Sequence, residues 1–197
     1  MALFCGIDEA GRGALAGPVS AAAVILPARF PIHILDDSKK LTSKKRFAAE
    51  SVIKQSACWG VGFAAHTEID EINILQASLL AMKRAFENMR ARLDDWTSVN
   101  GLSERGITAM TDGIFRPDIA CAEVLEILCA PKADALYPAV MAASILAKTA
   151  RDRLMIELDA LYPDYGYAEH KGYPTPEHKK ICRRIGMSPI QRLSFRY

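Results

Sequence analysis

The sequence predicts an α/β fold, in which helices flank a mixed sheet and a small helical segment follows at the C-terminus. Short apolar runs are concentrated early in the chain, and later runs alternate with longer segments that carry apolar residues at helical spacing. With 197 residues, 50% of them hydrophobic, the chain is long enough for one domain with a full core. We expect residues 1–161 to form that domain and residues 162–197 to form a basic helical segment packed on it.

Five short runs have the composition of strands. They cover residues 2–7, 19–26, 57–65, 107–111 and 124–129. A glycine-rich turn joins the first two runs, so we expect these strands to be neighbours in the sheet.

Four segments have the pattern of helices. They cover residues 42–55, 69–93 and 138–161, and the stretch that begins at Thr175. Thr42 or Ser43 is expected to cap the first helix, and Thr67 the second, with Asp70 as its capping-box acid. Pro138 suits the first turn of the third helix. In the second helix the side chains that we expect in the core are Met82, Phe86 and Met89.

Cysteine usage and hydropathy indicate a cytoplasmic protein. The five cysteines are scattered and lack a C-x-x-C spacing, which argues against disulfides and a zinc site. No apolar run reaches the ~18 residues of a membrane span. A charge at Asp8 comes too early for a signal peptide. We therefore expect a monomer with no membrane partner.

Positive charge is concentrated at the C-terminus. Residues 165–197 contain seven Lys or Arg and two Glu, whereas the whole chain has a net charge of +2. A basic segment on a slightly acidic body suggests a polyanionic partner, and a solvated helix face explains the same charges equally well.

Acidic residues stand at or just after the ends of three predicted strands. Asp8 and Glu9 follow the first strand, Asp112 follows the fourth and Asp134 lies shortly after the fifth. Ligands of α/β sheets bind beyond the strand ends, and four carboxylates there would suit two divalent ions ~3.5–4 Å apart. From these residues alone, acids in solvated turns remain the plainer alternative.

The glycines after the first strand allow two further interpretations. Gly11 and Gly13 leave room for backbone groups to approach a phosphate or a sugar hydroxyl. Their spacing also resembles the start of G-x-G-x-x-G in a dinucleotide-binding oxidoreductase, with acids at 36–37 about 20 residues further on. Against that alternative, the third glycine is displaced to Gly17 and Pro18 follows where a helix should run. A non-catalytic nucleic-acid-binding module would explain the basic segment but not the acids.

Motifs along nearly the whole chain, in order, resemble the signature of one family. They include Gly6-Ile7-Asp8-Glu9-Ala10-Gly11-Arg12-Gly13, Asp37-Ser38-Lys39-Lys40-Leu41, Thr111-Asp112-Gly113, Ala142-Ala143-Ser144-Ile145-Leu146-Ala147-Lys148, His170-Lys171-Gly172-Tyr173-Pro174-Thr175 and Arg192-Leu193-Ser194-Phe195. The family that they resemble is type 2 ribonuclease H (ribonuclease HII).

This resemblance implies a ribonuclease H-like fold, with residues 1–161 as its catalytic domain, and endonucleolytic cleavage of the RNA strand of RNA–DNA hybrids. Single ribonucleotides embedded in duplex DNA are implied substrates, cut on their 5′ side to leave a 3′-hydroxyl and a 5′-phosphate. It also implies two Mg²⁺ or Mn²⁺ ions. The catalytic and metal-binding residues that it implies are Asp8, Glu9, Asp112 and Asp134.

The resemblance also implies substrate contacts outside the carboxylates. Residues expected to read the 2′-hydroxyl and the RNA–DNA junction are Gly11, Arg12, Gly13 and Tyr173. Residues expected to contact phosphate are Lys39, Ser144 and Lys148. Plainer interpretations are a solvated loop lysine for Lys39 and a helix-supporting i, i+4 pair of Lys148 with Asp152. Arg151 and Arg153 fit either surface ion pairs or substrate contact, and His170 fits either product release or a loop cap.

The chain departs from the family pattern at three positions. Ala133 replaces the usual glycine before Asp134, Thr111 replaces the usual valine before Asp112, and Gln191 replaces a common histidine. An alanine at position 133 restricts the backbone beside the last carboxylate.

Overall fold

The computed structural model of the chain describes residues 2–36, 41–103 and 106–196. Its centre is a five-stranded mixed sheet with the strand order β3-β2-β1-β4-β5, which confirms the predicted fold class. The strands are β1 (Leu3–Ala10), β2 (Val19–Ile25), β3 (Cys58–Ala64), β4 (Ile107–Asp112) and β5 (Val124–Ala130). Each lies where an apolar run predicts a strand.

The central strand, β1, is longer than its apolar run. The run ends at Ile7, but β1 continues through Asp8 to Ala10 because the antiparallel strand β2 pairs with it there, with Ala22 opposite Asp8. The first two acids therefore belong to a strand and have the fixed backbone of a sheet.

The parallel pairing of β1 with β4 brings distant acids to one edge of the sheet. Thr111 of β4 lies opposite Ile7 of β1. Because both strands run in the same direction, Asp8 and Asp112 follow at neighbouring positions where the carboxyl ends of parallel strands meet.

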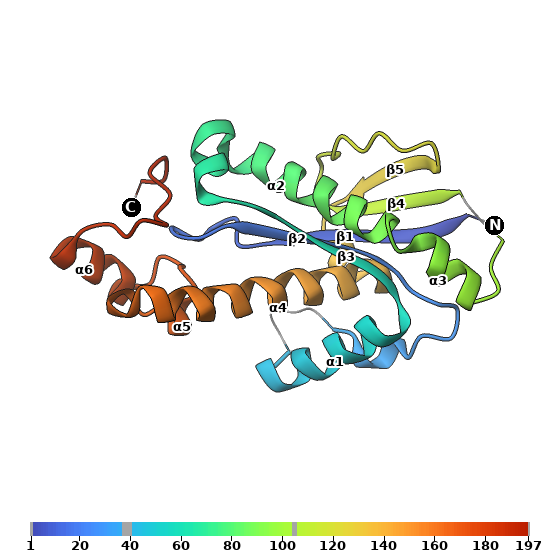
Figure 1. Cartoon of the computed structure of the whole chain (residues 1–197), viewed down its shortest axis with the longest axis horizontal. Coiled ribbons are helices and arrows are strands. Elements are labelled where there is room, and N and C mark those ends of the chain that lie inside the picture. Colours follow the sequence, from blue (N-terminus) through green and yellow to red (C-terminus); the bar gives the residue numbers. More distant parts are fainter. Residues whose placement is uncertain (1, 37–40, 104–105, 197) are drawn as a thin grey trace.

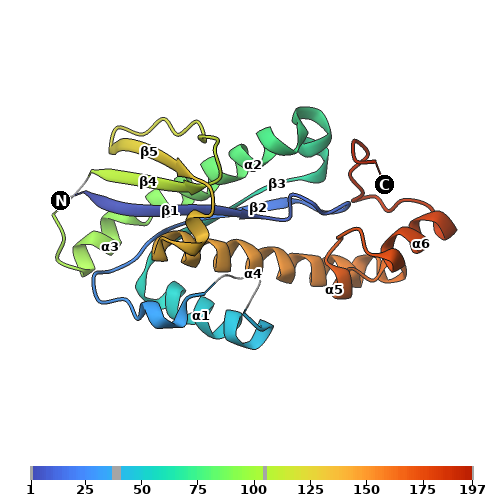
Figure 2. The same cartoon turned by 180° about the vertical axis from the view of Figure 1, so that it is seen from behind.

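Helices cover both faces of the sheet (Figures 1 and 2). α2 (His66–Arg90) lies along one face and leads to α3 (Leu93–Val99), while α4 (Pro138–Leu161) crosses the opposite face with α1 (Ser43–Ser56) beside it. α5 (Tyr167–His170) and α6 (Pro176–Ile185) follow α4 at the end of the molecule where the C-terminus lies. Single-turn 3-10 helices cover Ile32–Ile34, Ala133–Ala135 and Pro163–Tyr165.

A hydrophobic core fills each side of the sheet. Met82, Phe86 and Met89 of α2 are buried against it, as the sequence predicts. On the other side, Ile145 of α4 packs with Ile53 of α1. Each such side chain stabilises the fold by ~1.5–3 kcal/mol when it leaves water. Within the ranges described above, no helix has the length and apolar character needed to cross a membrane.

Thr42 caps α1 as predicted, Thr175 caps α6, and the predicted Thr67 cap of α2 is wrong. Thr42 accepts a hydrogen bond from the backbone N–H of residue 45 at 3.3 Å, and Thr175 accepts one from residue 178 at 3.2 Å. α2 begins at His66, before the predicted Thr67 cap, because Glu68 reaches back to accept the backbone N–H of Ala65 at 2.8 Å.

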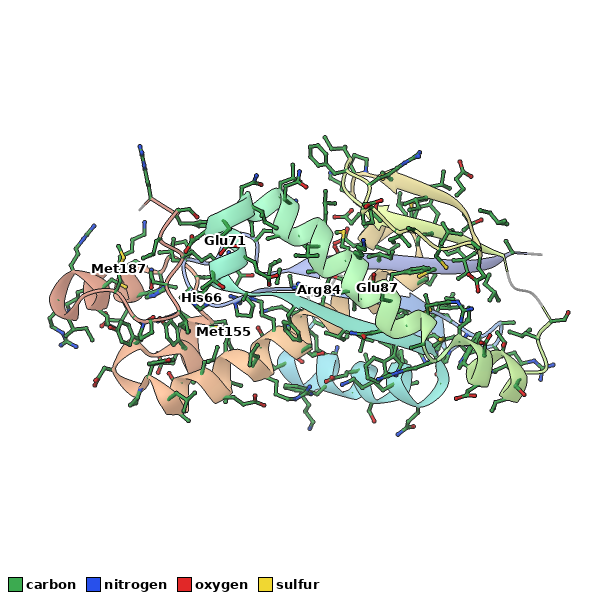
Figure 3. The ribbon with its side chains drawn as sticks, turned by 45° about the horizontal axis from the view of Figure 1, so that its top comes forward. His66, Glu71, Arg84, Glu87, Met155 and Met187 are labelled. Carbon is green, nitrogen blue, oxygen red and sulfur yellow. The ribbon has the colours of Figure 1, made fainter. Side chains whose placement is uncertain are left out.

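The start of α2 is also fixed to the neighbouring strand. Arg84, labelled in Figure 3, donates to both carboxylate oxygens of Glu68 at 2.9 and 2.7 Å and to the Phe63 carbonyl at 2.8 Å. A break follows at Asn73, whose φ is 67° and whose Oδ1 accepts the N–H groups of Leu75 and Gln76 at 3.0 and 3.2 Å. Asn73 therefore caps the longer second part of the helix.

Asp70 anchors the C-terminal segment, so its prediction as a capping-box acid is wrong. Its carboxylate accepts the N–H of Leu193 at 2.9 Å and both the N–H and hydroxyl of Ser194 at 2.8 and 2.6 Å. An isolated antiparallel bridge between Ala16 and Gln191 joins the same segment to the loop after β1. The last residues described thus pack on the turn that follows the first carboxylates.

Candidate active site

A cavity of about 290 Å³ lies where the carboxyl ends of β1 and β4 meet. The predicted site residues that line it are Asp8, Glu9, Gly11, Arg12, Gly13, Asp112, Asp134, Ser144, Lys148 and Tyr173. Lys39, the remaining predicted phosphate contact, lies outside the described residues. Residues from both ends of the sequence therefore converge on one hollow.

Three structural elements carry the four acids. β1 supplies Asp8 and Glu9, and β4 ends with Asp112. Asp134 lies in the 3-10 turn Ala133–Ala135, between β5 and the start of α4. Because β1, β4 and β5 are parallel neighbours, their carboxyl ends bring all four acids to the same edge.

Asp8 is the most buried of the four acids. Its side chain is only 5% exposed, and Oδ1 accepts the backbone N–H of Glu9 at 2.7 Å. Burial raises its pKa well above the usual range, and the negative charges of Glu9 and Asp112 raise it further, while a hydrogen bond from Ser144 opposes the shift. Asp8 thus occupies a site where a positive charge would be stabilising.

The negative charge of Glu9 is only partly neutralised by Arg12. Arg12 Nη1 lies 3.3 Å from Glu9 Oε1, but burial still raises the pKa of this carboxyl. Its other oxygen, Oε2, is buried and has no hydrogen-bond partner among the described residues. A buried carboxylate oxygen without a donor is costly, so this atom is suited to an additional cation.

The alanine at position 133 is compatible with the site. Its backbone N–H donates to Asp112 Oδ1 at 2.8 Å, and its side chain is fully buried. The left-handed residue of this turn is Lys132, with φ 63°, so the conformation that favours glycine does not fall on Ala133. The expected restriction at this position therefore does not disturb the turn that carries Asp134.

The chemistry of the cavity suits a hard divalent cation. Among the described residues, no three His, Cys, Asp or Glu side chains are gathered closely enough to enclose an ion as they stand. However, the orphaned Glu9 oxygen and the raised pKa of Asp8 both indicate a deficit of positive charge. Carboxylate oxygens are the ligands that Mg²⁺ and Mn²⁺ prefer, so the four acids fit such ions by charge and ligand type.

Lys148 stands at the cavity wall beside Tyr173. Its Nζ lies 2.5 Å from Asp152 Oδ1, which confirms the predicted i, i+4 pair, and 5.9 Å from the centroid of the Tyr173 ring. Burial lowers the pKa of Lys148, and the carboxylate of Asp152 opposes that shift. The ammonium is therefore held in place at the cavity by Asp152.

The two arginines near Asp152 on α4 differ in burial and in the groups that they contact. Arg153 is exposed and forms an ion pair, at 2.9 Å, with the buried carboxylate of Glu50. Arg151 is fully buried and donates to three backbone carbonyls, so a surface ion pair is the wrong interpretation for it. Sequence spacing did not reveal this difference, because the burial depends on how the loop after β1 folds over α4.

The side chains of His170 and Arg192 both form hydrogen bonds with backbone groups. His170 Nδ1 accepts the N–H of Gly172 at 3.1 Å, and its Nε2 lies 2.8 Å from the Tyr165 carbonyl, which favours the loop-cap interpretation. Arg192 is also fully buried, and its guanidinium donates to backbone of the loop after β1. The closing motif was visible in the sequence, but nothing in it indicated that Arg192 contacts the site.

Comparison with known proteins agrees with this geometry. The family model described as Ribonuclease HII matches residues 5–197. A ribonuclease HII of Treponema denticola is 51% identical over 195 residues, which cover 98% of this chain and 98% of that protein. A ribonuclease HII of Porphyromonas gingivalis is 48% identical over 194 residues, or 98% of this chain and 88% of that protein.

The fold is likewise found among solved structures. The structure described as the PCNA:RNase HII complex from Archaeoglobus fulgidus contains a chain that matches with a TM-score of 0.68 at 23% identity. The match covers 99% of this chain and 96% of that one. At this identity the likeness supports the fold alone.

Proposed function

This chain belongs to the ribonuclease HII family, whose members are metal-dependent endoribonucleases, and we propose that the cavity at the carboxyl ends of β1 and β4 is its catalytic centre. The enzyme hydrolyses the RNA strand of RNA–DNA hybrids. The observation that carries the assignment of the centre is the convergence of four acids from β1, β4 and the turn after β5 on one hollow. A dinucleotide site is excluded because strand β2, and not a helix, follows Gly17 and Pro18.

Two Mg²⁺ or Mn²⁺ ions would be held by the four carboxylates, Asp8, Glu9, Asp112 and Asp134. When bound, such ions lower the pKa of water and stabilise the charge that develops on attacking and leaving oxygens. Asp8 interacts electrostatically with both Glu9 and Asp112, so it would hold the metal charge together with them. Asp134, on a separate turn that lines the same cavity, would complete the set of carboxylates that hold the ions.

The reaction is hydrolysis of one phosphodiester bond. Water oxygen bonds to phosphorus on the 5′ side of the ribonucleotide, and the bond from phosphorus to the preceding O3′ breaks. The products are a 3′-hydroxyl, which takes up a proton, and a 5′-phosphate on the ribonucleotide. Lys148, held by Asp152, and Ser144 line the cavity and would contact the phosphate there.

Discrimination of RNA from DNA is assigned to the turn of residues 11–13 and to Tyr173. The 2′-hydroxyl is both a donor and an acceptor, and it marks a ribonucleotide in an otherwise DNA duplex. Gly13 is exposed at the cavity, and no atom lies within 4 Å of the position that a Cβ would occupy. Main-chain groups beside it can therefore meet a sugar hydroxyl. The Tyr173 ring would pack on the adjacent sugar and favour a junction with DNA.

The basic face of α6 would contact the duplex backbone. It consists of Lys179, Lys180, Arg183 and Arg184. Three of these side chains are exposed and Lys179 is half-buried. Phosphate contacts of this kind add affinity without sequence preference and weaken steeply as salt rises.

Cleavage of a matched set of substrates tests this function. A 5′-labelled duplex with one ribonucleotide, a long RNA–DNA hybrid and an all-DNA duplex of the same sequence are incubated with Mg²⁺, with Mn²⁺ and with EDTA. We expect metal-dependent cleavage of the first two substrates, products ending in a 3′-hydroxyl, and no cleavage of DNA. Cleavage in EDTA, or an intact duplex that carries one ribonucleotide, would contradict the proposal.

A further inference from the structure

Two fully buried arginines lie behind the catalytic cavity. Arg151 comes from α4, and Arg192 comes from the segment after α6. Neither forms a salt bridge with a carboxylate within the described part of the chain. Burial of a guanidinium without a counter-ion is costly, so its donors must be satisfied by other acceptors. Burial indeed lowers the pKa of both side chains, that of Arg192 to about 9.

Among the described residues, the guanidinium of Arg192 donates hydrogen bonds only to the loop after β1. Its Nη2 donates to the carbonyls of Gly11 at 2.8 Å and Pro18 at 3.1 Å, its Nη1 to that of Arg12 at 2.9 Å, and its Nε to that of Gly17 at 2.9 Å. One planar group therefore fixes both ends of the loop that contains the 11–13 turn. Two carbonyls of the turn are engaged in this way, so its backbone conformation is fixed from behind the cavity.

Arg151 instead joins two segments. It donates to the carbonyls of Ala16 at 3.1 Å and Pro18 at 2.9 Å in the loop after β1, and to the carbonyl of Lys171 at 2.8 Å. Its guanidinium carbon also lies 5.4 Å from the ring centroid of Tyr173. The same side chain thus contacts the loop that carries the turn and the segment that carries the tyrosine.

Other contacts show how closely these two segments approach. The N–H of Leu15 donates to the carbonyl of Gly172 at 2.8 Å. At Gly172, where φ is 79°, a Cβ would lie 2.6 Å from the Ala16 carbonyl oxygen. Met155, labelled in Figure 3, lies one turn after Arg151 on α4, and it packs with Ala16 in a small cluster at this junction.

We propose that Arg151 is a specificity-determining positioning residue, which fixes the 11–13 turn and Tyr173 relative to each other and so sets the preference for an RNA–DNA junction. The proposal rests on the function proposed above, in which the two elements read one nucleotide and its neighbour. Arg192 positions only the turn, so its replacement should affect cleavage of every substrate equally. A guanidinium can hold three carbonyls in one plane, whereas the ammonium of lysine is a single point of charge.

The test is the ratio of kcat/KM for a duplex with one ribonucleotide to kcat/KM for a long RNA–DNA hybrid, measured with Mg²⁺. Arg151→Lys should lower this ratio roughly tenfold, because a change of ~1.4 kcal/mol in relative transition-state binding corresponds to a factor of ten. Arg192→Lys should lower both values and leave the ratio unchanged. Arg153→Lys, on the exposed side of the same helix, is the matched control and should alter neither.

A double-mutant comparison separates positioning from general damage. In a Tyr173→Ala background, Arg151→Lys should not lower the ratio further, because it acts through the ring that is missing. Gly172→Ala keeps both arginine side chains but forces apart the two segments that Arg151 joins, so it should also lower the ratio. If thermal denaturation shows that Arg151→Lys is unfolded at the assay temperature, the ratio of the two kcat/KM values is measured for Gly172→Ala instead.

The outcomes are distinguishable. If the wild-type enzyme does not cleave at a single ribonucleotide, the proposed function fails. If it does, and folded Arg151→Lys and Gly172→Ala both keep the wild-type ratio, the positioning role of Arg151 is overturned. An additional loss of selectivity by Arg151→Lys in the Tyr173→Ala background would overturn it as well.

Discussion

Replacing either glycine of the 11–13 turn with alanine should have a different main effect at each position. Gly11→Ala should lower the stability of the fold, whereas Gly13→Ala should lower the rate of cleavage. Gly11 is buried with φ at 97°, and a Cβ there would lie 2.0 Å from Arg151 Nε. Gly13 is exposed, and its Cβ position is open. The first glycine is therefore needed for packing, whereas the second is available to the substrate.

The expected magnitudes follow from these surroundings. A left-handed backbone at Gly11 would cost alanine ~1–3 kcal/mol, and displacement of the buried Arg151 side chain would add ~1–3 kcal/mol of overpacking. A protein of this size loses ~2–4 °C in Tm for each kcal/mol, so Gly11→Ala should lower Tm by at least ~4 °C. Gly13→Ala should be neutral or stabilise by up to ~1 kcal/mol.

Gly13→Ala should lose cleavage without losing stability, whereas any loss of cleavage by folded Gly11→Ala would follow from the displaced Arg151 side chain. A methyl group at Gly13 obstructs the approach of the sugar hydroxyl, and loss of one such hydrogen bond corresponds to roughly tenfold in kcat/KM. The assay combines thermal denaturation by circular dichroism with cleavage of both RNA-containing substrates at a temperature where each variant is folded. If Gly13→Ala kept both wild-type Tm and wild-type cleavage, or if Gly11→Ala melted like the wild type, the roles assigned to the two glycines would be refuted.

Three further predictions concern the metal, the basic face and pH. Mg²⁺ at a hundredfold excess over its Kd should add about 2.7 kcal/mol to the free energy of unfolding and so raise Tm. Asp112→Asn should remove most of this rise in Tm. An identical rise in that variant would exclude Asp112 from the metal site. Neutralising the basic face of α6 should raise KM and flatten its salt dependence without moving the cleavage position, and an unchanged KM at low salt would show that this face is merely solvated. The hydrogen bonds from Arg84 hold the pKa of Glu68 below its usual value of 4.5, so the stability that the pair contributes is complete above about pH 4.5 and is lost as pH falls through the lowered pKa. Glu68→Gln should flatten the acid limb of urea-unfolding free energies, and an unchanged limb would show that the pair is energetically silent.

Local patterns predicted most of the secondary structure because they depend on residues close in sequence. The helix predicted over 138–161 coincides with α4, since Pro138 suits its first turn and Pro163 follows its end. The start of α2 was missed because its cap is not a side chain at the N-cap position; Glu68 reaches back from the third helical residue. Spacing alone did not distinguish that arrangement from a Thr67 cap.

The motifs predicted the residues that line the candidate site, but they did not predict the buried arginines that hold its loops in place. Asp8 and Asp112 meet because β1 pairs with β4, a contact between segments about 100 residues apart. Arg151 and Arg192 have sequence neighbours typical of exposed helix and tail residues, and only the folded loop after β1 supplies the carbonyls that bury them. Likewise, the acceptability of Ala133 depends on which residue of its turn has positive φ.

The most direct test of the catalytic centre is single-turnover cleavage of a duplex with one ribonucleotide by amide variants of the four acids. Each should cleave at least ~100-fold more slowly than the wild type at saturating Mg²⁺, because the charge that binds the ions is lost. In metal-free buffer, Asp8→Asn should melt at or above the wild-type temperature, since it removes repulsion between Asp8 and its neighbours Glu9 and Asp112. Asp118→Asn, an exposed acid outside the cavity, should behave as wild type. Wild-type cleavage by folded Asp8→Asn or Asp112→Asn, or inactivity of Asp118→Asn, would contradict the account.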